Sequence, residues 1–363
     1  MDDIARRVGV HRATVSNVLN GKYKAERSDA ARRAAYIRRV AEEMGFRPSL
    51  AARATRTGRT GLIGMIRSVS KACAVIEPEF DSGLDEALHA RGYSLLRDLI
   101  PDDATEAPRI VRQNAIDGLI INHAFGTPAP IRELLDRCGL PTVWVNRKRD
   151  ADCVRPNDYG AAQVATRFLL DHGHDRVAFL DPGIHTSGPD IEEPESVVRD
   201  PHYSRGDRID GYAATMADAG LKPDIVSLQR PTTLAESKAG WLLKTFVAFL
   251  RPLDRPTAVL CNADGRTMLH AASIVGLRVP QDLSVICFDT EASADERTAV
   301  DRVLVPYRPM GMAAVAMLCD AISQPGSTQS PIVIPFEFHR TGTVARPGHG
   351  PVNPLGVSSQ SLA

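Results

Sequence analysis

From residue 61 onward, short apolar segments alternate with longer segments of helical periodicity, and this alternation constrains the fold more than any other feature. We expect strands at 62–66, 93–96, 118–121, 142–145, 176–180, 225–228, 257–261 and 284–288. The helices expected between them are 83–89, 106–114, 130–138, 160–172, 208–219, 234–250 and 265–275. Strands that alternate with helices form parallel sheets with helices on both faces. Because the rhythm occurs twice, we expect two α/β lobes, connected by crossing strands, with a ligand-binding cleft between them.

Length and composition exclude several classes of protein. A chain of 363 residues is too long for one compact core and suits two or three domains. Hydrophobic residues make up 43% and charged residues 24%, and no apolar run is long enough to span a membrane. The N-terminus has no apolar signal segment, and the six cysteines are scattered without a metal-binding spacing. We therefore expect a cytoplasmic protein with reduced thiols and no zinc site.

The charge of the chain is strongly asymmetric although the total is zero. Residues 1–60 hold 14 lysines and arginines against 6 acidic residues, and the remainder of the chain carries a net charge of −8. A basic head on an acidic body indicates that the head binds a polyanion. The alternative is a basic, solvated face that has no partner.

The first twenty residues have the pattern of a helix-turn-helix. Apolar residues recur at helical spacing in 4–8 and again in 15–19, and Gly9 lies between the two runs. Glycine accepts the positive φ that a tight turn requires. If Val15 and Val18 face inward, the outer face of the second helix is short, polar and nearly uncharged, which suits a helix in the major groove. That face carries Arg12, Ala13, Ser16, Asn17 and Asn20.

These segments resemble a known family of regulators. Residues 3–5, 9–10 and 13–21 are similar to the headpiece of the lac-repressor/galactose-repressor (LacI/GalR) family, and the similarity continues through 45–48, 52–53 and 56–64 to about residue 345. The resemblance implies an N-terminal all-α helix-turn-helix headpiece plus an α/β two-lobed periplasmic-binding-protein-like sensor domain. The expected divisions are a headpiece at 1–47, a hinge or linker at 48–60 and an effector-binding and dimerisation domain at 61–345. Residues 346–363, rich in Gly, Pro and Ser, are expected to be a disordered tail.

The resemblance assigns DNA-binding roles to residues of the second helix. Arg12, Ala13 and Asn17 occupy the base-reading positions, where Arg12 suits guanine and Ala13 suits a thymine methyl group. The family usually has Arg where this chain has Asn17, and an Asn side chain matches adenine, so the preferred operator should differ there. Thr14, Ser16 and Asn20 are expected to bind phosphates.

The hinge departs from the family pattern. Family members insert a leucine into the minor groove seven residues after a proline, and this count from Pro48 reaches Thr55, which is a poor wedge. Either the DNA is kinked less, or Leu50 or another residue replaces the wedge. We expect Ala52 and Arg53 to lie in a hinge helix that forms on DNA, with a flexible tether as the alternative.

The resemblance also assigns an effector site in the body. Arg208, in the Arg-x-x-Gly-Tyr motif of 208–212, and Asp289, which follows Phe288, correspond to residues that bind a sugar or purine effector in the family. A guanidinium and a carboxylate suit vicinal hydroxyl groups, although both could pair only with their neighbours. Further candidates are Asn157, Asp158, Glu77, Asn122 and His123.

Other sequence features near this site differ from the family. Asn157-Asp158 is reversed in order, Ala263 replaces an Asn, and 74–77 lacks a stacking aromatic. The acidic, proline-rich stretch 182–204 is expected to be a surface loop and a candidate lid.

Together these patterns predict a ligand-controlled transcriptional repressor that binds double-stranded operator DNA as a homodimer or tetramer. The effector is expected to be a carbohydrate, and no cofactor, metal ion or membrane partner is expected. The His172–Asp175 turn lacks further metal ligands at a suitable spacing, and no local catalytic motif is present, so we expect no enzyme. The alternatives are an enzyme on the same α/β body, a solute-binding transport component, and a DNA-binding regulator without a small-molecule effector.

Overall fold

The structure is a computed structural model that describes residues 1–19, 23, 28–47, 54, 57–68, 78–101, 104–113, 115–122, 128–181, 202–228, 238–262, 265–289 and 300–348. Two compact units are present, Met1–Thr60 and Gly61–Ala363. Some expectations concern residues outside the described set, namely Asn20, Leu50, Ala52, Arg53, Thr55, Glu77, His123, 182–201 and 349–363.

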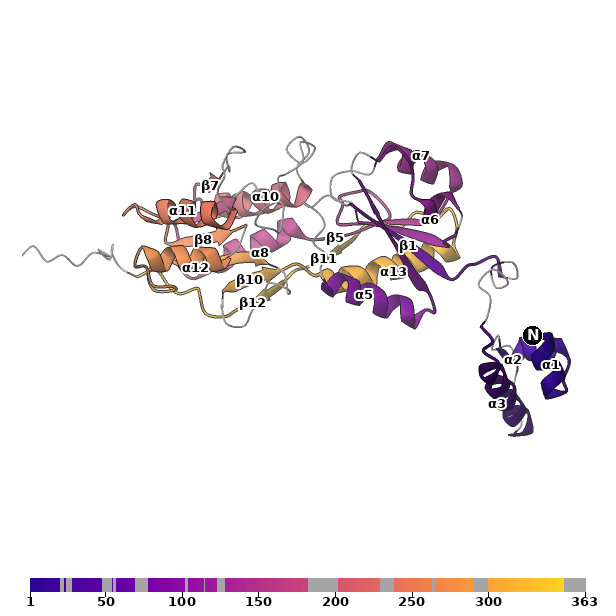
Figure 1. The fold of residues 1–363 in the computed structure, drawn as a ribbon. Coiled ribbons are helices and arrows are strands. Elements are labelled where there is room, and N and C mark those ends of the chain that lie inside the picture. The colour runs from indigo at the N-terminus through magenta and orange to yellow at the C-terminus, as the bar shows by residue number, and fades with distance from the viewer. Residues whose placement is uncertain are drawn as a thin grey trace, which may run out of the picture. The chain divides into compact units, whose positions relative to one another are not determined.

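Three helices of the first unit pack around a small apolar core, and Figure 1 shows their arrangement. They are α1 (Asp2–Val8), α2 (Arg12–Leu19) and α3 (Ser28–Glu43). Val15 and Val18 of α2 are buried against Ile4 of α1 and Ile37 of α3. Gly9 ends α1 at φ 71° and donates its N–H to the carbonyl of Ala5, so it occupies the left-handed conformation that the turn requires. The predicted helix-turn-helix is confirmed.

The first lobe of the second unit is a six-stranded parallel sheet with helices on both faces. In spatial order its strands are β11 (Ile332–Ile334), β5 (Cys153–Pro156), β4 (Thr142–Val145), β3 (Gly118–Asn122), β1 (Leu62–Ser68) and β2 (Ser94–Ile100). Helices α5 (Pro78–Ala90) and α13 (Tyr307–Ser323) pack on one face, and α6 (Arg109–Arg112) and α7 (Ala129–Cys138) pack on the other (Figure 1).

The second lobe repeats this arrangement. Its strands, in spatial order, are β12 (Glu337–His339), β10 (Asp301–Leu304), β9 (Ser284–Asp289), β8 (Ala258–Cys261), β6 (Val177–Asp181) and β7 (Asp224–Ser227). Only β12, among the described strands of this sheet, pairs antiparallel to its neighbour. Helices α8 (Asp158–Asp171) and α10 (Tyr203–Asp218) cover one face, and α11 (Lys238–Leu250) and α12 (Gly265–Ile274) cover the other.

The chain crosses between the lobes after β5, after β10 and after β11. The sequence predicted crossing strands, but β5, β10, β11, β12 and α13 were not among the expected elements. The four strands have only three or four residues, which is too short for a periodic pattern to identify them. Residues 202–204, expected in the surface loop, instead form the N-cap and first turn of α10, because the His202 side chain accepts the N–H of Ser204.

Candidate functional site

Helix α2 presents the face that the sequence assigns to base reading. Arg12, Ala13 and Asn17 are exposed, and Thr14 and Ser16 are half-buried at its margin. Val15 and Val18 are buried on the opposite side, so the hydrophobic core fixes which side chains α2 offers to a partner. Arg12 is the one charged residue of α2, and its side chain is exposed. The exposed face is therefore polar with a single charge, which suits hydrogen bonding with the edges of DNA bases.

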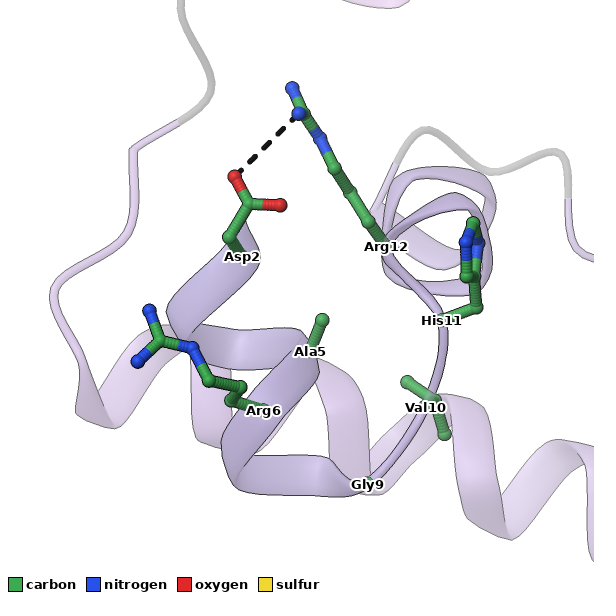
Figure 2. A pocket seen from close by; sticks show the side chains of 7 residues that line it. All are labelled: Asp2, Ala5, Arg6, Gly9, Val10, His11 and Arg12. Atoms are coloured by element: carbon green, nitrogen blue, oxygen red, sulfur yellow. Dashed lines mark ion pairs between the residues drawn. The ribbon is translucent and has the colours of Figure 1, made fainter.

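The turn before α2 holds the start of that helix in place. The Nδ1 atom of His11 accepts the backbone N–H of Ala13 at 3.2 Å, so the imidazole caps the helix N-terminus. Figure 2 shows the hollow between α1 and α2, where Arg12 extends beside Asp2 and their nearest charged atoms are 3.6 Å apart. Both side chains are largely exposed, and an exposed pair of this kind contributes about 1 kcal/mol at most. Arg12 can therefore leave Asp2 for a base or phosphate at little cost.

In the second unit, several polar residues lie at the carboxyl ends of the parallel strands. In the second lobe β7 lies on one side of β6 and β8 lies on the other, so the strand order reverses between β6 and β8. Ligands of open α/β sheets bind at such reversals, outside the carboxyl ends of the strands. Asp181 ends β6 and Asn262 directly follows β8. The first lobe reverses in the same way between β1 and β3, and β3 ends at Asn122.

Two arginines of α10, one turn apart, reach these strand ends. Arg205 donates from Nε to Asp181 at 2.6 Å, and the Asp181 side chain is almost completely buried. Arg208 donates from Nη1 to the Oδ1 atom of Asn262 at 2.8 Å. The helix is thereby tied to both sides of the strand reversal.

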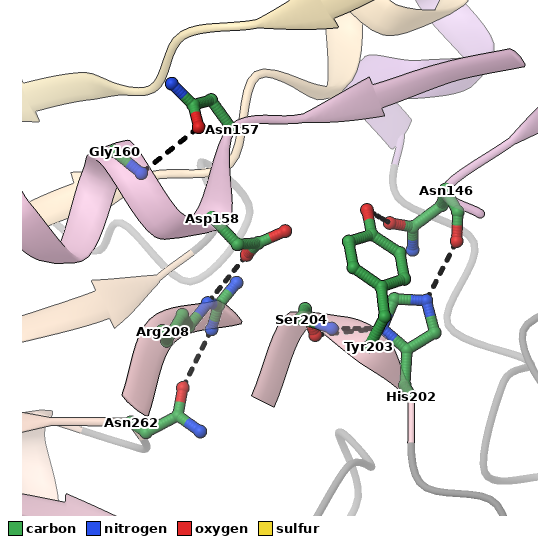
Figure 3. A network of polar contacts seen from close by, with 9 residues as sticks. All are labelled: Asn146, Asn157, Asp158, Gly160, His202, Tyr203, Ser204, Arg208 and Asn262. Atoms are coloured by element: carbon green, nitrogen blue, oxygen red, sulfur yellow. Dashed lines mark hydrogen bonds and ion pairs between the residues drawn. The ribbon is translucent and has the colours of Figure 1, made fainter. Parts of the chain in front are cut away.

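Arg208 is also fixed by a buried carboxylate and by aromatic rings. Its Nε donates to the Oδ1 atom of Asp158 at 2.7 Å (Figure 3). Its guanidinium lies 4.3 Å from the ring centre of Phe288 and 5.7 Å from that of Phe336. Burial raises the pKa of Asp158, and the Arg208 charge acts in the opposite direction. The side chain of Arg208 is 15% exposed and that of Asp158 is 0% exposed. The pair is therefore withdrawn from water almost completely.

The remaining predicted ligand residues lie in different surroundings. Asn157 uses its Oδ1 atom to accept the N–H of Gly160 at 3.1 Å, so it caps α8. Asp289 is half-buried at the end of β9, in the same lobe as Arg208. Asn122 is half-buried at the end of β3, in the other lobe. The structure thus brings Arg208 and Asp158 into direct contact and places Asn122 on the opposing sheet.

Sequence reasoning missed a polar contact between the lobes. Asn146, which follows β4 of the first lobe, has φ 56° and accepts a hydrogen bond from the Nε2 atom of His202 on its backbone carbonyl at 2.8 Å (Figure 3). The hydroxyl of Tyr203 donates to the Oδ1 atom of Asn146 at 3.3 Å. Lys148 adds an ion pair to Asp207 of α10 at 2.7 Å. In a structure, a non-glycine residue at positive φ is a signal that points to a functional site. No sequence pattern predicted this conformation for Asn146.

Neither the described side chains nor the described helices indicate a metal centre or a membrane span. No group of three or more His, Cys, Asp or Glu side chains among them could hold a metal ion, and none of these helices is long and apolar enough to cross a membrane. His174 of the rejected metal motif is buried and bonded to Thr257, Ser284 and the carbonyl of Ala345.

Two family models match the chain. The model of bacterial regulatory proteins of the lacI family matches residues 1–49, and that of the periplasmic binding protein-like domain matches residues 166–344. The repressor PurR of Pectobacterium carotovorum is 28% identical over 332 residues, covering 88% of this chain and 89% of PurR. The ribose operon repressor of Escherichia coli is 29% identical over 337 residues, covering 90% of this chain and 93% of that repressor.

A solved structure with the same fold is the lac repressor dimer bound to operator and the anti-inducer ONPF. It superposes with a TM-score of 0.67 at 18% sequence identity, and the match covers 94% of this chain and 98% of the repressor. The likeness therefore extends over both units of the fold.

Proposed function

Because the chain belongs to the LacI family of bacterial regulatory proteins, we propose that it is a sequence-specific DNA-binding repressor whose operator affinity is set by a small ligand. The observation that carries this proposal is the exposed face of α2, where Arg12, Ala13 and Asn17 project from a helix whose other side is buried. In this proposal α2 lies in the major groove, Arg12 reads guanine and Asn17 reads adenine. Thr14 and Ser16 bind phosphates and set the register.

A homodimer follows from the size of the DNA-reading surface. One helix-turn-helix contacts only a half-site, and a twofold-symmetric pair of headpieces reads a pseudo-palindromic operator. The lac repressor, which shares this fold, is a dimer on its operator. In our proposal, residues 1–47 form the headpiece, 48–60 the hinge and 61–345 the effector and dimerisation domain.

The ligand is proposed to bind at the carboxyl ends of the strands in the second unit. Arg208, Asp158 and Asp289 are its contacts in one lobe, and Asn122 is its contact in the other. A ligand that bonds both lobes stabilises one lobe arrangement over another, and only this difference in affinity can alter DNA binding. Such a coupling typically amounts to about 1–3 kcal/mol.

The relatives named above are transcriptional repressors, and we propose the same non-enzymatic role for this chain. A protein that acts on operator DNA must reach that DNA, so we propose that it works in the cytoplasm.

Operator binding of the full chain and of a fragment that starts at Gly61 tests the proposal. Operator DNA is first selected with the full chain, and both proteins are then titrated against it by fluorescence anisotropy. We expect the full chain to bind with an affinity that falls steeply with salt, because lysine and arginine contacts to phosphate release counterions. We expect the fragment to remain folded and to lose binding. A fragment that binds the operator as tightly as the full chain would overturn the proposal.

A further inference from the structure

We propose that Asp2 is a specificity-determining residue of the DNA-binding headpiece. Its carboxylate orients the guanidinium of Arg12 toward guanine and lowers the affinity of the headpiece for DNA that lacks this base. The inference rests on the proposed function, because it concerns how α2 reads an operator. Three features carry it: the position of the two side chains, the donors that Arg12 keeps, and the sign of the charge on Asp2.

The packing of the first unit holds Asp2 and Arg12 beside each other. Asp2 is the first residue of α1, Arg12 is the first residue of α2, and both line the hollow between the two helices. His11 accepts the backbone N–H of Ala13, so the start of α2 is fixed as well. Figure 2 shows the carboxylate and the guanidinium pointing toward each other, with the Oδ2 and Nη1 atoms 3.6 Å apart.

Asp2 differs from its neighbour Asp3 in the partner that its carboxylate contacts. Within the described part of the chain, Asp2 forms an ion pair with Arg12 alone, whereas Asp3 pairs with Arg6 of its own helix. The side chains of Arg12 and Asp2 are 66% and 63% exposed, so DNA can reach both. The carboxylate of Asp2 thus contacts the residue that the proposed function assigns to guanine.

Arg12 keeps enough donors to read a base while it stays beside Asp2. A guanidinium has five N–H groups, and guanine offers the acceptors O6 and N7 to a pair of them. Asp2 approaches the guanidinium most closely at Nη1, and the Arg12 side chain makes no hydrogen bond to any described residue. A carboxylate on one side of this planar group limits its rotation, so less conformational freedom is lost when the base is bound.

The negative charge of Asp2 acts against binding to the DNA backbone alone. Residues 1–60 hold 14 lysines and arginines against 6 acidic residues, and a carboxylate beside the base-reading face repels phosphates. Binding that depends only on phosphate contacts is therefore weakened, whereas binding in which Arg12 reaches guanine gains its hydrogen bonds. Specificity is a difference between two affinities, and a group that disfavours the wrong partner increases it.

The test measures base discrimination by Asp2→Asn in the full chain. Operator selection with Arg12→Ala first identifies the position whose base preference depends on Arg12. Fluorescence anisotropy then gives the affinities for the operator, for the operator with adenine in place of guanine at this position, and for a scrambled duplex. We expect Asp2→Asn to lower the affinity ratio of the first two duplexes about three- to fivefold, the size of effect that an exposed ion pair supports. The same variant should bind the scrambled duplex more tightly than the wild type does.

Asp3→Asn is the matched control, since it removes the same charge from the adjacent residue of α1. We expect this variant to keep the wild-type ratio, because its charge change acts on both duplexes alike. Adding Asp2→Asn to Arg12→Ala should leave the ratio of that variant unchanged, because the guanidinium is already absent. A wild-type ratio in Asp2→Asn, an equal fall in Asp3→Asn, or a further fall in the double variant would overturn the inference.

The operator selection keeps the two proposals apart. If the wild type enriches an operator and Asp2→Asn discriminates like the wild type, the role of Asp2 is refuted while the proposed DNA-binding function stands. If Arg12→Ala loses no base preference, the inference fails together with the base contact assigned to Arg12. If the wild type enriches no operator at all, the proposed function itself fails.

Discussion

Replacing Arg208 with methionine should destabilise the second unit by about 3–4 kcal/mol at pH 7 and by much less at pH 5. The substitution keeps the apolar contact with Phe288 but leaves the Asp158 carboxylate buried without its partner. Breaking a buried ion pair on one side costs about 3–5 kcal/mol. The carboxylate can avoid this cost only by taking up a proton. The free energy needed to protonate this carboxylate, relative to the unfolded chain, therefore sets an upper limit on the loss of stability.

That limit follows from the ordinary pKa of the carboxyl, which is 3.8. Protonating such a group costs about 1.4 kcal/mol for each pH unit above its pKa, which gives about 4.4 kcal/mol at pH 7 and about 1.6 kcal/mol at pH 5. The sign follows from proton uptake: the native variant holds a proton that the unfolded chain releases, so its stability falls as pH rises. The difference between wild type and variant should thus increase by about 1.4 kcal/mol per pH unit over this range.

Tryptophan fluorescence during urea unfolding of the full chain measures this difference. The two tryptophans, Trp144 in β4 and Trp241 in α11, lie one in each lobe, so the signal reports the second unit alone. Adding Asp158→Asn to the methionine variant should restore most of the stability, because the buried charge is then gone. A loss below about 1 kcal/mol at pH 7, a loss equal at both pH values, or a double variant no more stable than the single one would refute the reasoning.

Two further predictions concern the packing of the second unit. Burial lowers the pKa of His174, so the unfolded chain takes up a proton that the native protein does not, and wild-type stability should fall as pH decreases from 7.5 to 5.5. His174→Gln should flatten this decrease, measured by thermal unfolding. If the stability of wild type and variant falls equally with pH, the interpretation is contradicted. In α10, Gly211→Ala would place a methyl group against the backbone oxygen of Tyr159 and should cost about 1–3 kcal/mol, measured by urea unfolding. Gly206→Ala faces open space in the same helix and should stabilise by up to about 1 kcal/mol, so equal effects of the two substitutions would refute the packing argument.

The sequence predicted the elements whose patterns are local. The turn at Gly9 and the buried pair Val15 and Val18 follow from helical periodicity and from the conformational freedom of glycine. The repeated alternation of strands and helices likewise indicated two parallel sheets. The sequence did not predict β11 or α13, which follow the second lobe's strand β10 yet pack in the first lobe. Their pairing depends on contacts between residues far apart in the chain, which no local periodicity encodes.

The sequence predicted only part of the candidate ligand site, because several of its contacts also join residues far apart in the chain. Arg208 and Asp158 could be named from motifs, but the stacking of Phe288 and the bond to Asn262 depend on how β8, β9 and α10 meet. A general rule could have found Asn262, because polar residues at the carboxyl ends of parallel strands converge at one edge of the sheet. Asn157 has a structural role that the motif did not indicate, since the Oδ1 atom of its side chain caps α8.

The most direct test of the account is a selection of operator sequences from a random DNA pool, carried out with the wild type and with Asn17→Arg. If α2 reads bases in the major groove of a twofold-symmetric site, the wild type should enrich a pseudo-palindromic motif. The variant should keep this motif except at one position of each half-site, where preference should move toward guanine by about 1–3 kcal/mol. A pool without any enriched motif, or the same motif for both proteins, would contradict the account.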